Sequence, residues 1–312
     1  MSGIHGAARA ETAALTRRIT ALSVGVAAVL VAIKAFAWTA SSSAALLASL
    51  ADSALDLLAS LVTFFAVRYA VVPPDAEHRF GHGKAEAFAS LLQAGLVFAS
   101  AALVAREAAA RLADPRPLEN GAWAVAVMLI SIMLTGLLIA AQTRALRQTA
   151  SVAVSGDRAH FATDLGSNLA ALIGIAGAAW LGFPILDAVA AILVAALLLW
   201  GAIGVFREAG AQLMDRELSD EDRDMILAAA AGRDPRVLGV HGLRTRASGP
   251  FVHIQLHLDL DPQLTLEAAH EVLIGAERRI LAIFPAADIL IHPNPRGRAA
   301  PHGGPFAEAD PA

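Results

Sequence analysis

Two pairs of candidate metal ligands lie within apolar stretches of the sequence. Asp52 and Asp56 occur in one stretch, His160 and Asp164 in another, and the members of each pair are four residues apart. Residues four apart share one face of a helix, so each pair would project its side chains in one direction. Three carboxylates and one imidazole suit the tetrahedral ligand shell of zinc. The spacing predicts a divalent-cation site formed by two helices.

These acids are costly if the apolar stretches cross a membrane. A charged side chain at the centre of a bilayer costs about 2.5–3.5 kcal/mol on insertion scales. A bound divalent cation would offset that cost. The simpler alternative is that the aspartates are protonated, or that they bond to nearby Ser, Thr and Asn side chains between helices. Two matched pairs on separate stretches favour the cation site over this alternative.

A second cluster of candidate ligands lies between two apolar stretches. It contains Asp75, His78 and His82, and Gly81 and Gly83 flank the second histidine. The glycines permit a tight turn, which would fold the three side chains around one cation. A polar loop at the level of the lipid headgroups explains the same residues equally well. Spacing alone leaves both interpretations open.

Six apolar stretches must position these side chains. A bilayer span needs roughly 20 mostly apolar residues. The chain is 56% hydrophobic and only 17% charged, with a mean hydropathy of +0.58. A transmembrane domain of six helices is predicted over residues 15–210, after a cytoplasmic segment of residues 1–14. The predicted spans are residues 15–38, 44–70, 86–112, 121–143, 159–181 and 185–206.

Basic residues indicate the orientation of these spans. Ten Lys or Arg residues lie on the side of the N-terminus and the 71–85 loop, whereas the opposite side carries Arg111 and Arg116, with Arg106 near a helix end. Cytoplasmic segments of membrane proteins are enriched in Lys and Arg. Both termini are therefore predicted to be cytoplasmic.

Residues 211–295 are predicted to form a small cytoplasmic domain. Of the 28 acidic and 24 basic residues of the chain, 24 lie after residue 215. The αββαβ order predicts an α+β, ferredoxin-like fold, and the Pro- and Gly-rich residues 296–312 predict a disordered tail. The predicted elements are a helix over 219–231, strands over 237–247 and 251–260, a helix over 264–284 and a strand over 288–292.

Histidines recur within this domain. Imidazole is the commonest metal ligand in proteins, so five histidines in about fifty residues indicate a further metal site. The five are His241, His253, His257, His270 and His292.

Composition and motifs exclude several classes of function. The chain has no cysteine, which excludes a disulfide scaffold, thiolate metal sites and cysteine catalysis. Its net charge of −4 and 5% aromatic content argue against a nucleic-acid partner. An intramembrane metalloprotease would need a motif such as His-Glu-x-x-His, which is absent. We expect neither an enzyme nor a bound cofactor.

The chain resembles the cation diffusion facilitator family, most closely its bacterial zinc and ferrous-iron efflux members. The resemblance rests on the two ligand pairs in the second and fifth spans, followed by a cytoplasmic α+β domain. It extends from about residue 13 to 295 and includes residues 34–38, 80–86 and 243–246.

The resemblance implies three metal sites. The transport site would comprise Asp52, Asp56, His160 and Asp164, and a loop site would comprise Asp75, His78 and His82. A binuclear site at a dimer interface of the soluble domain would use His241, His257, His270 and His292. Asn294 stands where the family has an aspartate, which weakens the case for the second metal of that site. His253 has no recognised counterpart and would be the residue to compensate.

The resemblance also implies a function. The protein would be a homodimeric secondary transporter of the bacterial inner membrane that exports Zn²⁺, Fe²⁺, Cd²⁺ or Co²⁺ from the cytoplasm in exchange for protons. The same metal would be a regulatory ion at the cytoplasmic histidines. Two alternatives remain, namely a membrane-anchored metal sensor or scaffold without net transport, and a passive channel.

Overall fold

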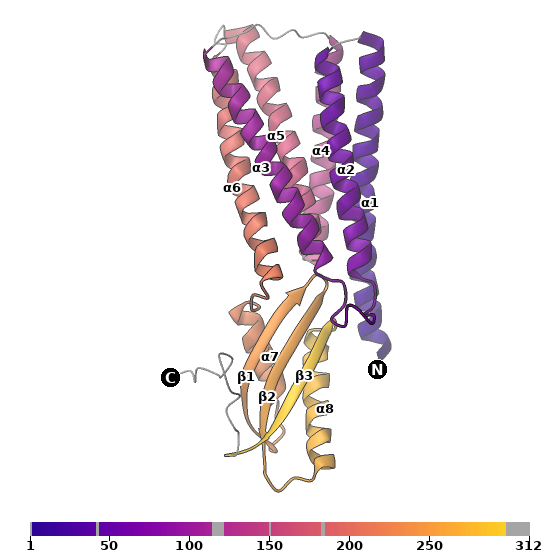
Figure 1. Cartoon of the computed structure of the whole chain (residues 1–312), viewed down its shortest axis with the longest axis vertical. Helices are drawn as coiled ribbons and strands as arrows, with labels where there is room; N and C mark the ends of the chain where they lie inside the picture. The colour runs from indigo at the N-terminus through magenta and orange to yellow at the C-terminus, as the bar shows by residue number, and fades with distance from the viewer. Residues whose placement is uncertain (1, 42–43, 114–121, 150, 182–184, 298–312) are drawn as a thin grey trace. The chain divides into compact units, whose positions relative to one another are not determined.

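The structure is a computed structural model that describes residues 2–41, 44–113, 122–149, 151–181 and 185–297. The chain divides into two compact units, of which one comprises residues 12–213 and the other residues 1–11 together with 214–312. The first unit consists of long helices, and the second combines two helices with a sheet (Figure 1). Each unit is described by itself below.

Long helices form the first unit. Within it, α3 packs against α5 and α6, while α5 also contacts α2, α4 and α6. The helix that carries His160 and Asp164 therefore touches most of its neighbours. The helices are α1 (Ser2–Ser41), α2 (Ala44–Ala70), α3 (Ala85–Ala113), α4 (Ala122–Thr149), α5 (Val152–Leu181) and α6 (Ile185–Leu213).

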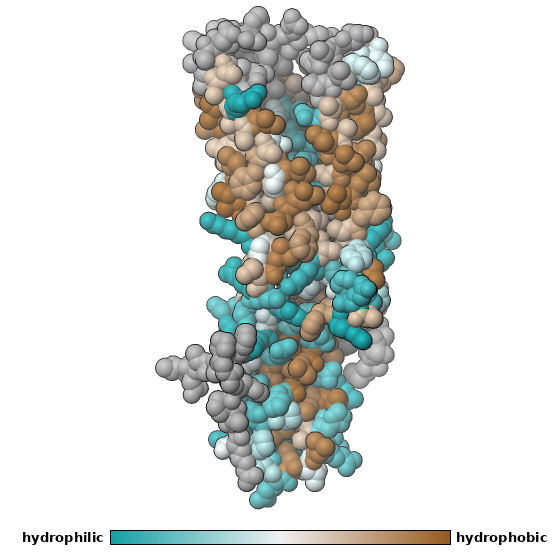
Figure 2. Space-filling model, in the orientation of Figure 1, coloured by the Kyte–Doolittle hydropathy of each residue, from teal (hydrophilic) through white to brown (hydrophobic). Residues whose placement is uncertain are grey.

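Four of these helices are long and apolar enough to cross a membrane, among the residues that the structure describes. Only 28–39% of the most apolar part of each is buried inside the protein, so most of its apolar surface faces outward. Figure 2 shows these outward side chains as a brown surface over the helices. The chain is a multi-pass membrane protein, and four of the six predicted spans are confirmed. They are Ala13–Ala40, Ser49–Ala70, Ala85–Arg106 and Ala126–Thr149.

Helix α5 begins at Val152, although the predicted fifth span begins at residue 159. Ser151 explains this early start, because its Oγ accepts a hydrogen bond from the amide of Val154 at 3.4 Å. The same hydroxyl donates to Glu86 Oε2 at 2.5 Å, and Glu86 is 3% exposed. These groups satisfy amides that a helix start leaves unpaired. The helix therefore extends beyond the apolar stretch, and His160 lies more than two turns inside it.

The second unit contains helices α7 (Asp220–Ala231) and α8 (Leu266–Ile283) and strands β1 (Val237–Ser248), β2 (Phe251–Leu260) and β3 (Ala287–Pro295). The sheet order is β1-β2-β3, with β1 antiparallel and β3 parallel to β2. A helical crossover is required between parallel neighbours, and α8 provides it between β2 and β3. This domain of helices and a three-stranded sheet follows the predicted element order.

Both helices begin at residues that cap them. The Ser219 side chain accepts from the amide of Asp222, and the Thr265 side chain accepts from that of Ala268, each at 3.2 Å. Such caps satisfy amides of the first helical turn and favour helix initiation there. Gly232 ends α7 with a φ of 56°, a conformation that glycine adopts without strain.

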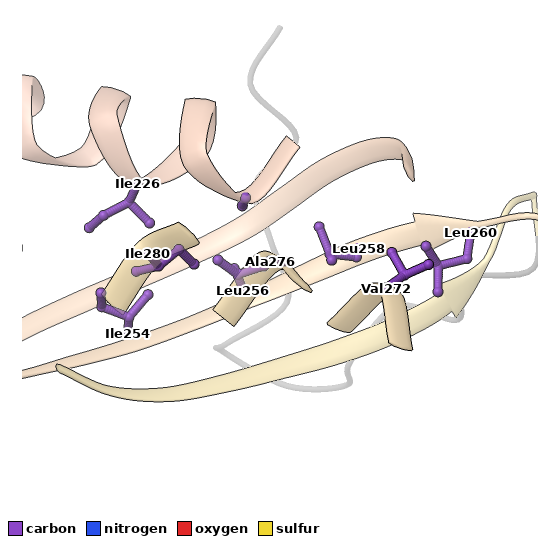
Figure 3. Close-up of a cluster of buried hydrophobic side chains, with 9 residues drawn as sticks. Ile226, Ile254, Leu256, Leu258, Leu260, Val272, Ala276 and Ile280 are labelled. Atoms are coloured by element: carbon purple, nitrogen blue, oxygen red, sulfur yellow. The ribbon is translucent and has the colours of Figure 1, made fainter. Parts of the chain in front are cut away.

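The hydrophobic core of the second unit lies between the sheet and the two helices (Figure 3). Alternate residues of β2 supply one side of it, because side chains of a strand alternate between its two faces. The opposite face of β2 carries His253, His257 and Asp259. The core residues that Figure 3 labels are Ile226, Ile254, Leu256, Leu258, Leu260, Val272, Ala276 and Ile280.

Candidate metal sites

Asp56, His160 and Asp164 come together between α2 and α5. Each offers one ligand atom, and these atoms lie within 4.8 Å of one another. His160 Nε2 lies 3.0 Å from Asp56 Oδ1, and only 4% of His160 is exposed. Two carboxylates and one imidazole with converging atoms are ligands that a divalent transition metal accepts. The structure thus brings together three of the four predicted intramembrane ligands.

Asp52, the fourth predicted ligand, lies one turn before Asp56 on α2. It is exposed, and it does not belong to a metal-ligand group found among the described residues. One helical turn, an advance of about 5.4 Å along α2, separates Asp52 from Asp56. Asp52 interacts electrostatically with Asp56 and with Lys34 of α1. It therefore contributes charge near the cluster.

Packing on both sides of His160 fixes this part of α5. Phe161 is 1% exposed and packs in a cluster with Ala27 of α1 and Leu138 of α4. Gly156 lies against α3, where a Cβ atom would come within 2.9 Å of Ser90 Oγ. The absence of a side chain at Gly156 lets these helices approach closely. Both contacts hold the turn that presents His160 toward α2.

Asp157, which the sequence analysis did not single out, lies completely buried one turn before His160. Gln142 Nε2 donates to its Oδ2 at 2.9 Å. Its Oδ1 accepts from Ser60 Oγ and from Gln93 Nε2, each at 3.4 Å, and Ser23 also bonds to the carboxylate. These four donors come from α1, α2, α3 and α4. Buried Gln residues within apolar helices were the available signal for this network.

Asp75, His78 and His82 also converge, in the loop between α2 and α3. One ligand atom from each lies within 4.8 Å of the others. Asp75 Oδ2 lies 3.2 Å from His82 Nε2, and Asp75 Oδ1 lies 3.3 Å from His78 Nδ1. Gly81, with a φ of 82°, provides the turn between the two histidines. The loop therefore has the folded arrangement that a single cation requires.

Backbone groups orient the loop ligands. The amides of His78 and Glu77 donate to Asp75 Oδ1 at 2.6 and 2.9 Å. These hydrogen bonds, the one from His78 first, hold the pKa of Asp75 below its ordinary value of 3.8. His82 Nδ1 lies 3.3 Å from the carbonyl oxygen of Val72, which leaves Nε2 directed at Asp75. A second ring nitrogen bonded to a carbonyl is the usual way in which metal-binding histidines are oriented.

Three histidines of the second unit lie side by side across the sheet. His257 of β2 is the register partner of His241 on β1 and of His292 on β3. The His257 ring centroid lies 5.2 Å from that of His241 and 5.0 Å from that of His292. Three neighbouring strands thus present imidazoles at one level of the open sheet face.

Two further side chains complete this row. Asn294 Nδ2 lies 3.1 Å from His257 Nδ1 and 3.3 Å from His241 Nε2. Asp259, the register partner of Asn294, places Oδ1 3.2 Å from His241 Nε2. The sequence analysis missed Asp259, although it lies two residues after His257 and so shares its face. Its carboxylate supplies negative charge beside the neutral Asn294.

The remaining two histidines lie elsewhere. His270 is exposed on α8, and no metal-ligand group within the described parts of the chain contains it. His253 is 7% exposed, and its Nδ1 lies 3.1 Å from Asp288 Oδ2. It lies four residues before His257, about 13 Å along an extended strand. The structure therefore pairs His253 with Asp288 and does not bring it to Asn294.

Apolar helices that hold a cluster of aspartate and histidine side chains indicate to which class this protein belongs. It is a multi-pass membrane protein with a candidate cation site inside its helical domain. Residues 20–214 match the family described as cation efflux transmembrane domain. Residues 218–296 match the family described as cation efflux protein, cytoplasmic domain. The chain belongs to this cation efflux, or cation diffusion facilitator, family, which confirms the resemblance found in the sequence.

The similarity to individual relatives covers most of the chain. The cation-efflux pump FieF of Shewanella oneidensis is 42% identical over 273 residues, which cover 88% of this chain and 92% of the relative. The cation-efflux pump FieF of Yersinia enterocolitica is 42% identical over 269 residues, covering 86% and 89%. The protein of the same name from Yersinia pestis is 39% identical over 269 residues, with the same coverage. The likeness therefore includes both units.

Proposed function

We propose that this protein exports divalent metal cations from the cytoplasm in exchange for protons. The observation that carries the proposal is the convergence of Asp56, His160 and Asp164 inside the helical unit. Ionisable residues within membrane helices mark ion pathways, because their burial is otherwise unfavourable. Relatives named as cation-efflux pumps support the direction of transport. The protein is accordingly a secondary transporter rather than an enzyme.

Proton exchange follows from the chemistry of the ligands. A metal binds deprotonated carboxylates and neutral imidazole, so metal and protons compete for the same groups. His160 is the proposed proton carrier, since imidazole titrates near neutral pH, and the carboxylates share this role. The transport site comprises Asp56, His160 and Asp164, with Asp52 as the fourth ligand when helix α2 moves. Such a site alternates between the two sides of the membrane as helices rock.

We further propose six membrane spans, in which α5 and α6 join the four spans described above. Their lengths of 30 and 29 residues exceed the roughly 20 that a bilayer requires. The distribution of Lys and Arg supports cytoplasmic termini in a bacterial inner membrane. The proposed domains are residues 1–14, a transport domain of 15–210, a ferredoxin-like metal-binding and dimerisation domain of 211–295, and a tail of 296–312.

The proposed substrates are Zn²⁺ and Fe²⁺, with Cd²⁺ and Co²⁺ as further candidates. Imidazole with carboxylates suits these transition metals, whereas an all-oxygen ligand set would favour Mn²⁺. We propose that the protein acts as a homodimer, in which the loop ligands and the strand histidines with His270 bind the same metals. Metal at these positions stabilises the dimer state that binds it.

The test uses the full-length protein in proteoliposomes loaded with a pH-sensitive dye. Zn²⁺ added outside drives proton movement in the wild type, and Asp56→Ala abolishes this movement because the ligand cluster loses a carboxylate. Asp261→Ala is the matched control, since it removes an exposed aspartate of the second unit. Its proton flux remains at the wild-type level.

Three outcomes contradict the proposal. Undiminished proton flux in Asp56→Ala shows that the cluster of Asp56, His160 and Asp164 is not the transport site. Zn²⁺ binding without flux in the wild type identifies a membrane-anchored sensor or scaffold. Zn²⁺ flux that does not respond to an imposed pH gradient identifies a passive channel.

A further inference from the structure

Lys34, seven residues before the end of α1, is a buried basic residue beside the proposed transport site. It is 8% exposed. Its Nζ donates to Ser53 Oγ at 2.6 Å and to the backbone carbonyl of Ser49 at 3.3 Å. Both partners belong to α2, where Ser53 directly follows Asp52. Lysine is rarely buried to this extent, which indicates a specific role for its charge.

The charges that act on Lys34 are those of the site. Its ammonium group interacts electrostatically with Asp56, Asp164 and Asp52, whereas its direct hydrogen bonds go to neutral oxygens. An ammonium group has three donors and no lone pair, so it cannot be a metal ligand. In its ammonium form, Lys34 therefore contributes a positive charge beside the ligands and takes no position in the coordination shell.

Counting charge indicates what this lysine does. The three ionised ligand aspartates carry −3, and a divalent cation leaves this ligand set at −1 when His160 is neutral. Asp157 is not a ligand, and its carboxylate is stabilised by its own hydrogen-bond donors. The charge of Lys34 brings the total of the loaded ligand set to zero. A neutral site is far less costly to move through a low-dielectric interior than a charged one.

We propose that Lys34 is a resident counter-cation of the transport site, a positioning residue that acts on the metal through its charge. This proposal rests on the proposed function and deepens it. While the site is empty, Lys34 offsets part of the repulsion between the carboxylates. When metal enters, the same charge weakens binding enough for release and leaves the loaded site neutral.

Removing this charge has two opposite effects. Cation binding becomes stronger, because a repelling positive charge next to the ligands is lost. Movement of the loaded site becomes slower, because that site now carries a net negative charge. We expect the KM for Zn²⁺ to fall about tenfold and kcat to fall at least about tenfold, which corresponds to about 1.4 kcal/mol for each tenfold change.

The variants for the test are Lys34→Gln, Lys34→Arg and Asp56→Ala in full-length protein. Lys34→Gln removes the charge and keeps donors for Ser53 and Ser49, whereas Lys34→Arg keeps the charge. Zn²⁺ uptake into proteoliposomes at pH 8 gives KM and kcat, and size-exclusion chromatography in detergent reports folding. Lowered KM with lowered kcat in Lys34→Gln, and values within threefold of the wild type in Lys34→Arg, support the proposal.

Other outcomes overturn it. Unchanged or raised KM in Lys34→Gln shows that the charge does not oppose metal binding. Loss of folding in Lys34→Gln together with failure of Lys34→Arg to transport shows that Lys34 has a structural role. Asp56→Ala separates the two proposals, because its transport at the wild-type rate rejects the transport site itself, whatever Lys34 does.

Discussion

Gln142 of α4 and Asp157 of α5 are joined by a 2.9 Å hydrogen bond between the amide Nε2 and the carboxylate Oδ2. Both side chains are completely buried. This contact belongs to the network that ties four helices to the turn before His160. The network therefore places a cluster of buried donors around one carboxylate, next to the proposed metal ligands.

Asp157→Leu is expected to lower the stability of the helical unit. Leucine accepts no hydrogen bond, so Ser60, Gln93 and Gln142 each lose a buried acceptor. A buried polar group left without its partner costs about 1–3 kcal/mol. Thermal unfolding in detergent, followed by tryptophan fluorescence, measures the change. Thr163→Val is the control, because among the described residues that buried hydroxyl bonds only to Ala159 O of its own helix. An unfolding temperature of Asp157→Leu equal to that of this control contradicts the prediction.

Asn294→Asp is expected to tighten metal binding by the second unit. The new carboxylate would lie beside His241 and His257 and would add the charge that the neutral amide lacks. We expect the dissociation constant for Zn²⁺ to fall at least about tenfold, since metals favour ionised ligands. Titration calorimetry of residues 211–312, which enclose their own hydrophobic core, measures it. The control variant Gln263→Glu adds the same charge in the loop before α8. Equal dissociation constants for Zn²⁺ in the two variants would show that the position of the added carboxylate does not matter.

Asp234 is expected to stabilise the second unit at neutral pH and to lose this effect in acid. Arg236 donates to both of its carboxylate oxygens, at 3.0 and 2.8 Å, and holds the pKa of Asp234 below its ordinary value of 3.8. Because its pKa is lowered in the folded state, the contribution of Asp234 to the free energy of unfolding is complete above pH 3.8. It disappears as the pH falls through the lowered pKa. Asp234→Asn should therefore cost up to about 1 kcal/mol at pH 7, the range of surface ion pairs.

Urea unfolding of residues 211–312 at several pH values tests this prediction. The difference in the free energy of unfolding between the wild type and Asp234→Asn should narrow as the pH falls below 3.8. Asp261→Asn serves as the control, because Asp261 forms no ion pair among the described residues. A constant difference across the pH range contradicts the assignment.

The sequence was informative where the signal is local. Hydropathy located the helices, and the four-residue spacing identified Asp56, His160 and Asp164, because both properties depend on neighbours in the chain. Hydropathy could not locate the start of α5, since a cap and a buried glutamate set it. The predicted order of helices and strands in residues 219–292 likewise matches the second unit.

Contacts between distant segments were beyond such reasoning. Asp157 is significant only because donors from four other helices surround it. Spacing puts Asp259 on the strand face of His257, but only the register of β2 with β3 places it beside Asn294. The separation of His270 from the strand histidines depends on which face of the sheet α8 covers, and a histidine count does not contain that information.

The two faces of strand β2 carry different kinds of side chain, because side chains of a strand alternate between its faces. Ile254, Leu256 and Leu258 turn toward the helices, while His257 and Asp259 turn away from them. Residues on the face of His257 and Asp259 can therefore change without opening a void under α7 and α8. The chemistry of that face can thus vary while the folding of the unit stays intact.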